Sequence, residues 1–291
     1  MMTALNNKSK GIICILFAAL GFSFMTFFVR ISGDVPTMEK AFFRNAVAII
    51  ASLIFLARSG EKICIKKGCA GDIFFRCLFG TSGLIANFYA IDKLHIADAN
   101  MLNKLSPFFA ILISIPILRE KPKKIDILAV VVAFLGAMLI VRPTGSNLQL
   151  VPALIGLYGG FGAGTAYVFV RRLGSKGERT PIIVLCFSVF STLVTIPFIA
   201  MDFVPLSPRS LLCLVAAGLS ATVGQFGITS AYKYAPAKEI SVFDYTQVIF
   251  AAILGILFLG EVPTALSFAG YAIIIGVAVL RWRYNLRTGD E

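Results

Sequence analysis

The chain has 291 residues, of which 58% are hydrophobic and only 14% are charged. An average soluble domain has about 25% charged residues. Together with the mean hydropathy of +0.86, this composition excludes a soluble globular protein and predicts an integral membrane protein.

Apolar runs long enough to cross a bilayer as helices recur along the whole chain. No segment between them is polar and long enough to form a soluble domain, and no alternating barrel strands are seen. We therefore predict an all-α membrane protein with ten spans, at about 11–29, 41–57, 73–91, 97–118, 125–141, 151–170, 181–200, 210–231, 237–259 and 265–281.

The sequence repeats itself at an offset of 141 residues, which predicts two halves, 1–141 and 142–291, of five helices each. Because five is odd, the second repeat must enter the membrane from the opposite side. Inverted repeats are typical of transporters, which bind substrate between them. The matching pairs include Gly21 and Gly162, Arg30 and Arg171, Gly83 and Gly224, and the Leu-x-Glu-x-Pro runs that begin at Leu118 and Leu259.

The distribution of lysine and arginine predicts the orientation. If the N-terminus is cytoplasmic, the segments on the inside contain 19 of these residues and those on the outside contain 5. Short loops rich in lysine and arginine stay in the cytoplasm. We therefore expect a multi-pass protein of the cell (cytoplasmic) membrane with both termini inside. The net charge of +12 then reflects topology and contact with anionic lipid, and it does not indicate nucleic-acid binding.

Polar residues in the middle of two spans mark the candidate substrate site, because polar groups deep in a membrane are costly and usually functional. Asn103 and Lys104 in the fourth span correspond, at the repeat offset, to Asp244 and Tyr245 in the ninth. Lys104 and Asp244 are thus expected to be neighbours around a central cavity. The alternative is a structural ion pair, although buried pairs add little net stability because desolvation is costly.

Pro107 strengthens the prediction of a polar cavity. A proline lacks an amide hydrogen and displaces the carbonyl four residues earlier, which here belongs to Asn103. Irregular backbone at this depth is tolerated only where it faces protein or a water-filled cavity. Gln247, close to Asp244 in the ninth span, adds a further polar group.

Other polar residues of the second and third spans are candidates for the cavity wall. Asn87 and Tyr89 lie in the third span. Arg44 and Arg76 either face the cavity or extend their long side chains to the interface. The fifth and tenth spans carry no charge beyond their ends, so we expect them at the periphery, where the tenth could support a homodimer.

Similar motifs end each half. The first half has the runs 90–99, 106–109 and Leu118–Pro122, and the second has 231–237 and Leu259–Pro263. Over the whole chain this pattern resembles the EamA branch of the drug/metabolite transporter superfamily. The resemblance implies alternating access and export of small metabolites without naming a substrate. It also implies arginines at the positions of Arg44 and Arg76.

The glutamates of these motifs, Glu120 and Glu261, lie just past a helix and before a proline. A carboxylate there can cap the N-terminus of the following helix, and we expect this structural role. Arg119 departs from the family pattern, which has a small residue before the glutamate.

We expect a secondary transporter, an exporter, of an amino acid or related zwitterion. Lys104 would attract a carboxylate and Asp244 an amine or, alternatively, a proton. The alternatives are export of another metabolite or a drug-like cation, such as a nucleobase or amine, and a membrane-embedded enzyme. Against the enzyme, His95 is the sole histidine, no span has paired carboxylates, and the six cysteines lack metal-site spacing. We expect no catalytic residues, metal or cofactor.

Overall fold

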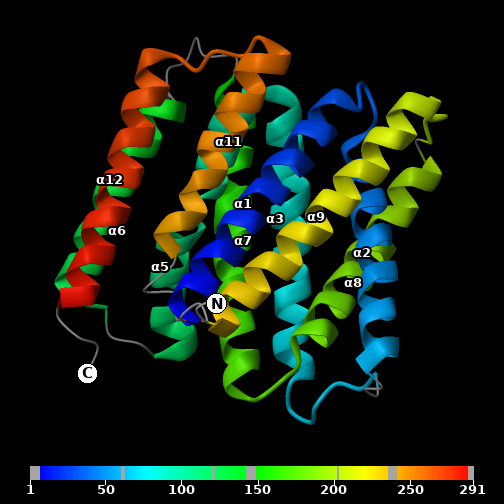
Figure 1. Cartoon of the computed structure of the whole chain (residues 1–291), viewed down its shortest axis with the longest axis horizontal. Coiled ribbons are helices and arrows are strands. Elements are labelled where there is room, and N and C mark those ends of the chain that lie inside the picture. The colour runs from blue at the N-terminus through cyan, green and yellow to red at the C-terminus, as the bar shows by residue number, and fades with distance from the viewer. Residues whose placement is uncertain are drawn as a thin grey trace, which may run out of the picture.

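The computed structural model describes residues 7–59, 63–119, 122–141, 149–201, 203–234 and 241–287. Long helices run side by side in an elongated array (Figure 1). They are α1 (Asn7–Ile31), α2 (Thr37–Ser59), α3 (Ala70–Lys93), α4 (Ile96–Asn103), α5 (Ser106–Leu118), α6 (Lys124–Val141), α7 (Leu150–Ser175), α8 (Thr180–Met201), α9 (Pro208–Tyr234), α11 (Thr246–Leu254) and α12 (Ala265–Arg287).

Ten segments of the described chain are long and apolar enough to cross a bilayer, one for each predicted span. The fourth combines α4 and α5 as Ile96–Leu118. The ninth, Val242–Leu259, contains α11 between a 3-10 turn, η1 (Ser241–Tyr245), and a π turn, η2 (Gly255–Leu259). Within the described ranges all regular structure is helical, which confirms the predicted fold class.

Two glycine-lined helix crossings connect the halves. A Cβ atom on Gly21 would lie 2.8 Å from the backbone nitrogen of Gly224, so α1 and α9 touch backbone to backbone. In the same way, a Cβ on Gly162 would lie 2.7 Å from Cα of Gly83, where α7 crosses α3. Small residues permit such close approach between membrane helices.

The 141-residue offset converts one of these crossings into the other, because it relates α1 to α7 and α3 to α9. An inverted two-fold between the halves would produce this exchange. The inversion stays a prediction that the matched crossings favour.

The fifth and tenth spans lie together at one edge of the array, as α6 and α12 (Figure 1). They too meet through glycine: a Cβ on Gly270 would be 2.7 Å from the carbonyl oxygen of Gly136. α2 and α8 occupy the opposite edge, while α1, α3, α7 and α11 lie between the two edges (Figure 1). The predicted peripheral position of the fifth and tenth spans is therefore correct.

Two helix ends share a left-handed backbone. Gly260 caps the ninth span with φ 64°, and Arg119, its equivalent at the repeat offset, caps α5 with φ 55°. A side chain in this region costs roughly 1–2 kcal/mol, which is why helices usually end on glycine. The family pattern of a small residue before the glutamate therefore has a conformational reason, and Arg119 retains the turn at an energetic cost.

We expect Gly162→Ala to destabilise the protein by about 1–3 kcal/mol, the usual cost of overpacking, because the new methyl group would push α3 from α7. Gly174→Ala is a matched control in the same helix, since its Cβ would meet nothing within 4 Å. Thermal unfolding of the purified variants in detergent measures the difference. Equal melting temperatures for the two variants would show that the crossing is not tight.

Candidate functional site

Two spans are interrupted at corresponding positions. α4 ends at Asn103, and α5 begins after a turn formed by Lys104 and Leu105. The predicted span over 97–118 is therefore present as Ile96–Leu118, and the irregular backbone expected near Pro107 is a break between two helices. Pro107 cannot donate a backbone hydrogen bond, so it lies in the first turn of a new helix. In the ninth span η1 gives way to α11 after Tyr245, the repeat equivalent of Lys104.

An ion pair joins these two interruptions. Nζ of Lys104 lies 2.5 Å from Oδ2 of Asp244, and the side chains are only 9% and 18% exposed. The phenol of Tyr245 donates to the carbonyl oxygen of Lys104 at 3.2 Å. The other carboxylate oxygen of Asp244, Oδ1, is buried without a hydrogen-bond partner in the described chain. The predicted contact between Lys104 and Asp244 is thus present, and an acceptor remains available beside it.

A layer of amides and hydroxyls lies next to the ion pair. Gln247 donates to Oδ1 of Asn100 at 2.6 Å, and Asn100 donates to the hydroxyl of Thr26 at 3.2 Å. Ser23 donates to the carbonyl oxygen of Gln247 at 2.9 Å, which fixes α1 against α11. Sequence reasoning missed Asn100, Thr26 and Ser23. Asn100 could have been found, because it lies one helical turn before Lys104 on the same segment.

The two arginines form a second cationic cluster. Their guanidinium carbons lie 5.4 Å (Arg44) and 4.2 Å (Arg76) from the centre of the Phe187 ring on α8. Arg44 also donates to Oδ1 of Asn45 at 2.8 Å. Each arginine is only 6% exposed, so neither side chain extends to the interface.

The remaining predicted site residues lie outside these two clusters. Asn87 is buried where α3 meets Gly159 of α7, and its Oδ1 has no partner among the described residues. Tyr89 and Asn103 are half-buried. Across the described ranges, no hydrogen bond or ion pair connects Arg44, Asn87 or Tyr89 to the Lys104–Asp244 pair. A substrate-binding role for each of these residues stays a prediction.

Ion pairs hold the end of the bundle to which Glu261 belongs, which we call the Glu261 end. Arg30 pairs with Glu261 at 2.7 Å and donates to the backbone carbonyls of Ile91, at 3.0 Å, and of Asp92. Lys40 pairs with the Asp92 side chain at 2.6 Å. These contacts link α1 and α2 to the end of α3 and to the loop before α12.

Glu261 caps a different helix from the one predicted. Its Oε2 accepts from the backbone amide of Ile96 at 2.8 Å, so it caps α4 in the first half rather than the following helix, α12. The tertiary fold brings these segments together, and the local sequence does not show it. Glu120, the corresponding residue of the first half, lies outside the described residues.

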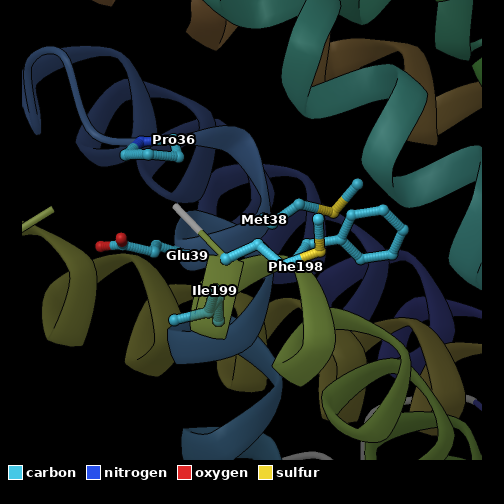
Figure 2. A pocket seen from close by; sticks show the side chains of 6 residues that line it. Pro36, Met38, Glu39, Phe198 and Ile199 are labelled. Carbon is cyan, nitrogen blue, oxygen red and sulfur yellow. The ribbon is translucent and has the colours of Figure 1, made fainter. Parts of the chain in front are cut away.

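A separate hollow of about 260 Å³ lies between the start of α2 and the end of α8 (Figure 2). Met38 and Phe198 lie toward one another on one side of it, while Pro36 and Glu39 lie on the other (Figure 2). Oε1 of Glu39 accepts from the amide of Val204 at 2.9 Å and so contributes to local structure. None of the residues that line this hollow belongs to either charged cluster.

The chemistry of the central cluster is that of binding. It offers an ammonium, a carboxylate with a free oxygen, and amides at the level where two helices are broken. In the part of the chain that the structure describes, no three His, Cys, Asp or Glu side chains are grouped to hold a metal ion. Ten apolar spans around such a polar centre are typical of a membrane carrier for small molecules.

The chain belongs to the EamA-like transporter family, whose sequence profile matches residues 9–142 and again residues 150–282. The two matches begin 141 residues apart, which equals the repeat offset. The family resemblance noted in the sequence is therefore confirmed, and the protein is a multi-pass membrane transporter.

Relatives of known name support this class. The pseudopaline exporter CntI of Pseudomonas aeruginosa is 33% identical over 93% of this chain and 95% of its own length. The riboflavin transporter of Vibrio cholerae is 25% identical over 94% of this chain and 93% of its own. A crystal structure that covers 97% of this chain and 99% of its own superposes with a TM-score of 0.70 at 15% identity, which shows the same fold.

We expect the single variants Lys104→Met and Asp244→Asn to lower stability more than the double variant does. Removing one partner of a buried pair leaves an uncompensated polar group, at a cost of about 3–5 kcal/mol, whereas removing both is often nearly neutral. Thermal unfolding of the four proteins in detergent gives the coupling free energy. If the two single substitutions changed the free energy of unfolding additively in the double variant, the contact between Lys104 and Asp244 would be contradicted.

Proposed function

We propose that the protein exports a small zwitterionic metabolite, an amino acid or a related compound, by alternating access across the cytoplasmic membrane. The Lys104–Asp244 pair carries this proposal. A substrate carboxylate would bind Lys104, and a substrate amine would bind Asp244, whose Oδ1 is available. Insertion of the substrate exchanges one ion pair for two, which offsets part of the cost of separating Lys104 from Asp244.

The direction of transport is proposed from a relative and from charge. The relative that is 33% identical is named an exporter. The excess of lysine and arginine in the loops at the end opposite Glu261 supports a cytoplasmic location for those loops and for both termini. In this orientation the Glu261 end faces outward.

Proton coupling through Asp244 and a homodimer through α12 are proposed as additional properties.

The Glu261 end supports a gating proposal. The pair between Arg30 and Glu261, together with the cap on Ile96, holds the end of α1 against α4 and the loop before α12. Release of substrate toward this end requires these contacts to separate. At the repeat offset, Arg30 and Glu261 correspond to Arg171 and Glu120, and Glu120 lies outside the described residues.

The transport test uses the double variant Lys104→Met with Asp244→Asn. If the pair were only structural, restoring charge balance would restore transport together with stability. We expect the double variant to fold but to lose saturable counterflow of labelled amino acids in proteoliposomes, by at least roughly a hundredfold, because two charge-assisted contacts to substrate are lost. Wild-type rates with unchanged pH dependence in this variant would refute the proposed site.

The gate test uses Glu261→Gln, which retains an acceptor for the Ile96 amide but removes the ion pair with Arg30. We expect a membrane-impermeant thiol reagent added outside cells to label a Thr26→Cys reporter roughly five- to tenfold faster, because a typical coupling free energy of 1–3 kcal/mol is lost. Asp126→Asn, which breaks the Asp126–Arg281 pair between α6 and α12, is the matched control. If Glu261→Gln and Asp126→Asn increased the rate of labelling equally, the result would argue against a specific gate at the Glu261 end.

A further inference from the structure

The charged groups buried in the membrane do not balance. Lys104 and Asp244 neutralise one another, whereas Arg44 and Arg76 make no ion pair with any described residue. Both guanidinium Nε atoms are buried without a hydrogen-bond partner in the described chain. The two buried clusters together therefore carry an excess of two positive charges.

Contacts within the protein only partly offset the cost of burying the two arginines. A cation over an aromatic ring gains only a small part of the free energy that it loses on leaving water, and both guanidinium groups rely on the single ring of Phe187. The two positive charges also repel one another. An arrangement that is this costly when empty is typical of a binding site for an anion.

Two further unpaired polar groups lie on the helix that carries Phe187. The hydroxyl oxygens of Ser188 and Thr192, one helical turn apart on α8, are buried without a partner among the described residues. Ser191, which lies between them in sequence, is hydrogen-bonded to Thr81 at 2.5 Å. Because buried polar groups are usually hydrogen-bonded, these two hydroxyls retain capacity to bond water or a ligand.

Tyr167 connects this region to the central pair. It lies on α7, and its hydroxyl interacts electrostatically with Asp244, Arg44 and Arg76. Tyr167 is therefore within electrostatic range of both clusters.

We propose that Arg44 and Arg76 form a second anion subsite, and that the substrate is an amino acid with one or two carboxylates in addition to its α-carboxylate. This inference rests on the proposed function, because the α-amino and α-carboxylate groups occupy Asp244 and Lys104. The guanidinium group presents a planar fork of donors that matches a carboxylate bidentately, as the lysine ammonium does not. Two further carboxylates on the substrate would cancel the buried positive charge.

Three amino acids that share a backbone test the proposal. The side chain of glutamine is neutral, that of glutamate carries one negative charge, and that of γ-carboxyglutamate carries two. Titration calorimetry of the purified full chain in detergent measures the three affinities. We expect affinity to rise roughly tenfold or more with each added carboxylate, the increment of a charge-assisted contact. Equal affinities in the wild-type protein would overturn the inference without any variant.

Arg44→Gln and Arg76→Gln should remove the preference for the acidic ligands, so that the three ligands bind with equal affinity. Thermal unfolding of the same variants reports that they fold. Arg44→Lys and Arg76→Lys, which retain the charge but lose the fork, should retain part of the preference. If the Arg44→Gln and Arg76→Gln proteins retained the full preference for the acidic ligands, the assignment would be overturned. If the wild-type protein binds all three ligands with equal affinity, only this inference fails. If none of the three ligands binds at millimolar concentration, the proposed function fails with it.

Discussion

The cost of placing charge and bare backbone inside a bilayer controls the organisation of this protein. Lys104 and Asp244 satisfy one another where two helices are broken, and the broken backbone must itself be covered by protein. Glycines of α7 achieve this on one side: a Cβ on Gly160 or Gly164 would lie 2.6 Å or 2.5 Å from a carbonyl oxygen near the break. On the other side, Ser23 of α1 donates to a carbonyl of α11. Close packing and the polar centre therefore depend on one another.

The Glu261 carboxylate has a role larger than that of a helix cap. It binds the backbone amide at the start of α4 and the guanidinium of Arg30, so one side chain holds two helices of the first half to a loop of the second. Since α4 leads directly to Lys104, a single short helix connects this loop to the central pair.

The sequence predicted the ten spans, the peripheral position of α6 and α12, and the contact between Lys104 and Asp244, because hydropathy and the repeat offset encode them. Two features of the structure could not be predicted from the sequence. Pro107 predicted irregular backbone near Asn103, but a proline that displaces a carbonyl does not show whether the helix kinks or, as observed, restarts after Lys104 and Leu105. The pairing of Arg44 and Arg76 about Phe187 depends on how α2, α3 and α8 pack, which no local pattern records.

The contact between Tyr245 and the backbone of Lys104 has a consequence for how a ligand is oriented. If a two-fold axis relates the halves, a residue that touches its own repeat equivalent lies close to that axis. Two identical five-helix chains paired about such an axis would place identical side chains on either side of it. In this chain the corresponding positions carry unlike side chains, lysine and tyrosine, and asparagine and aspartate, so a molecule with unlike ends can be held in one orientation.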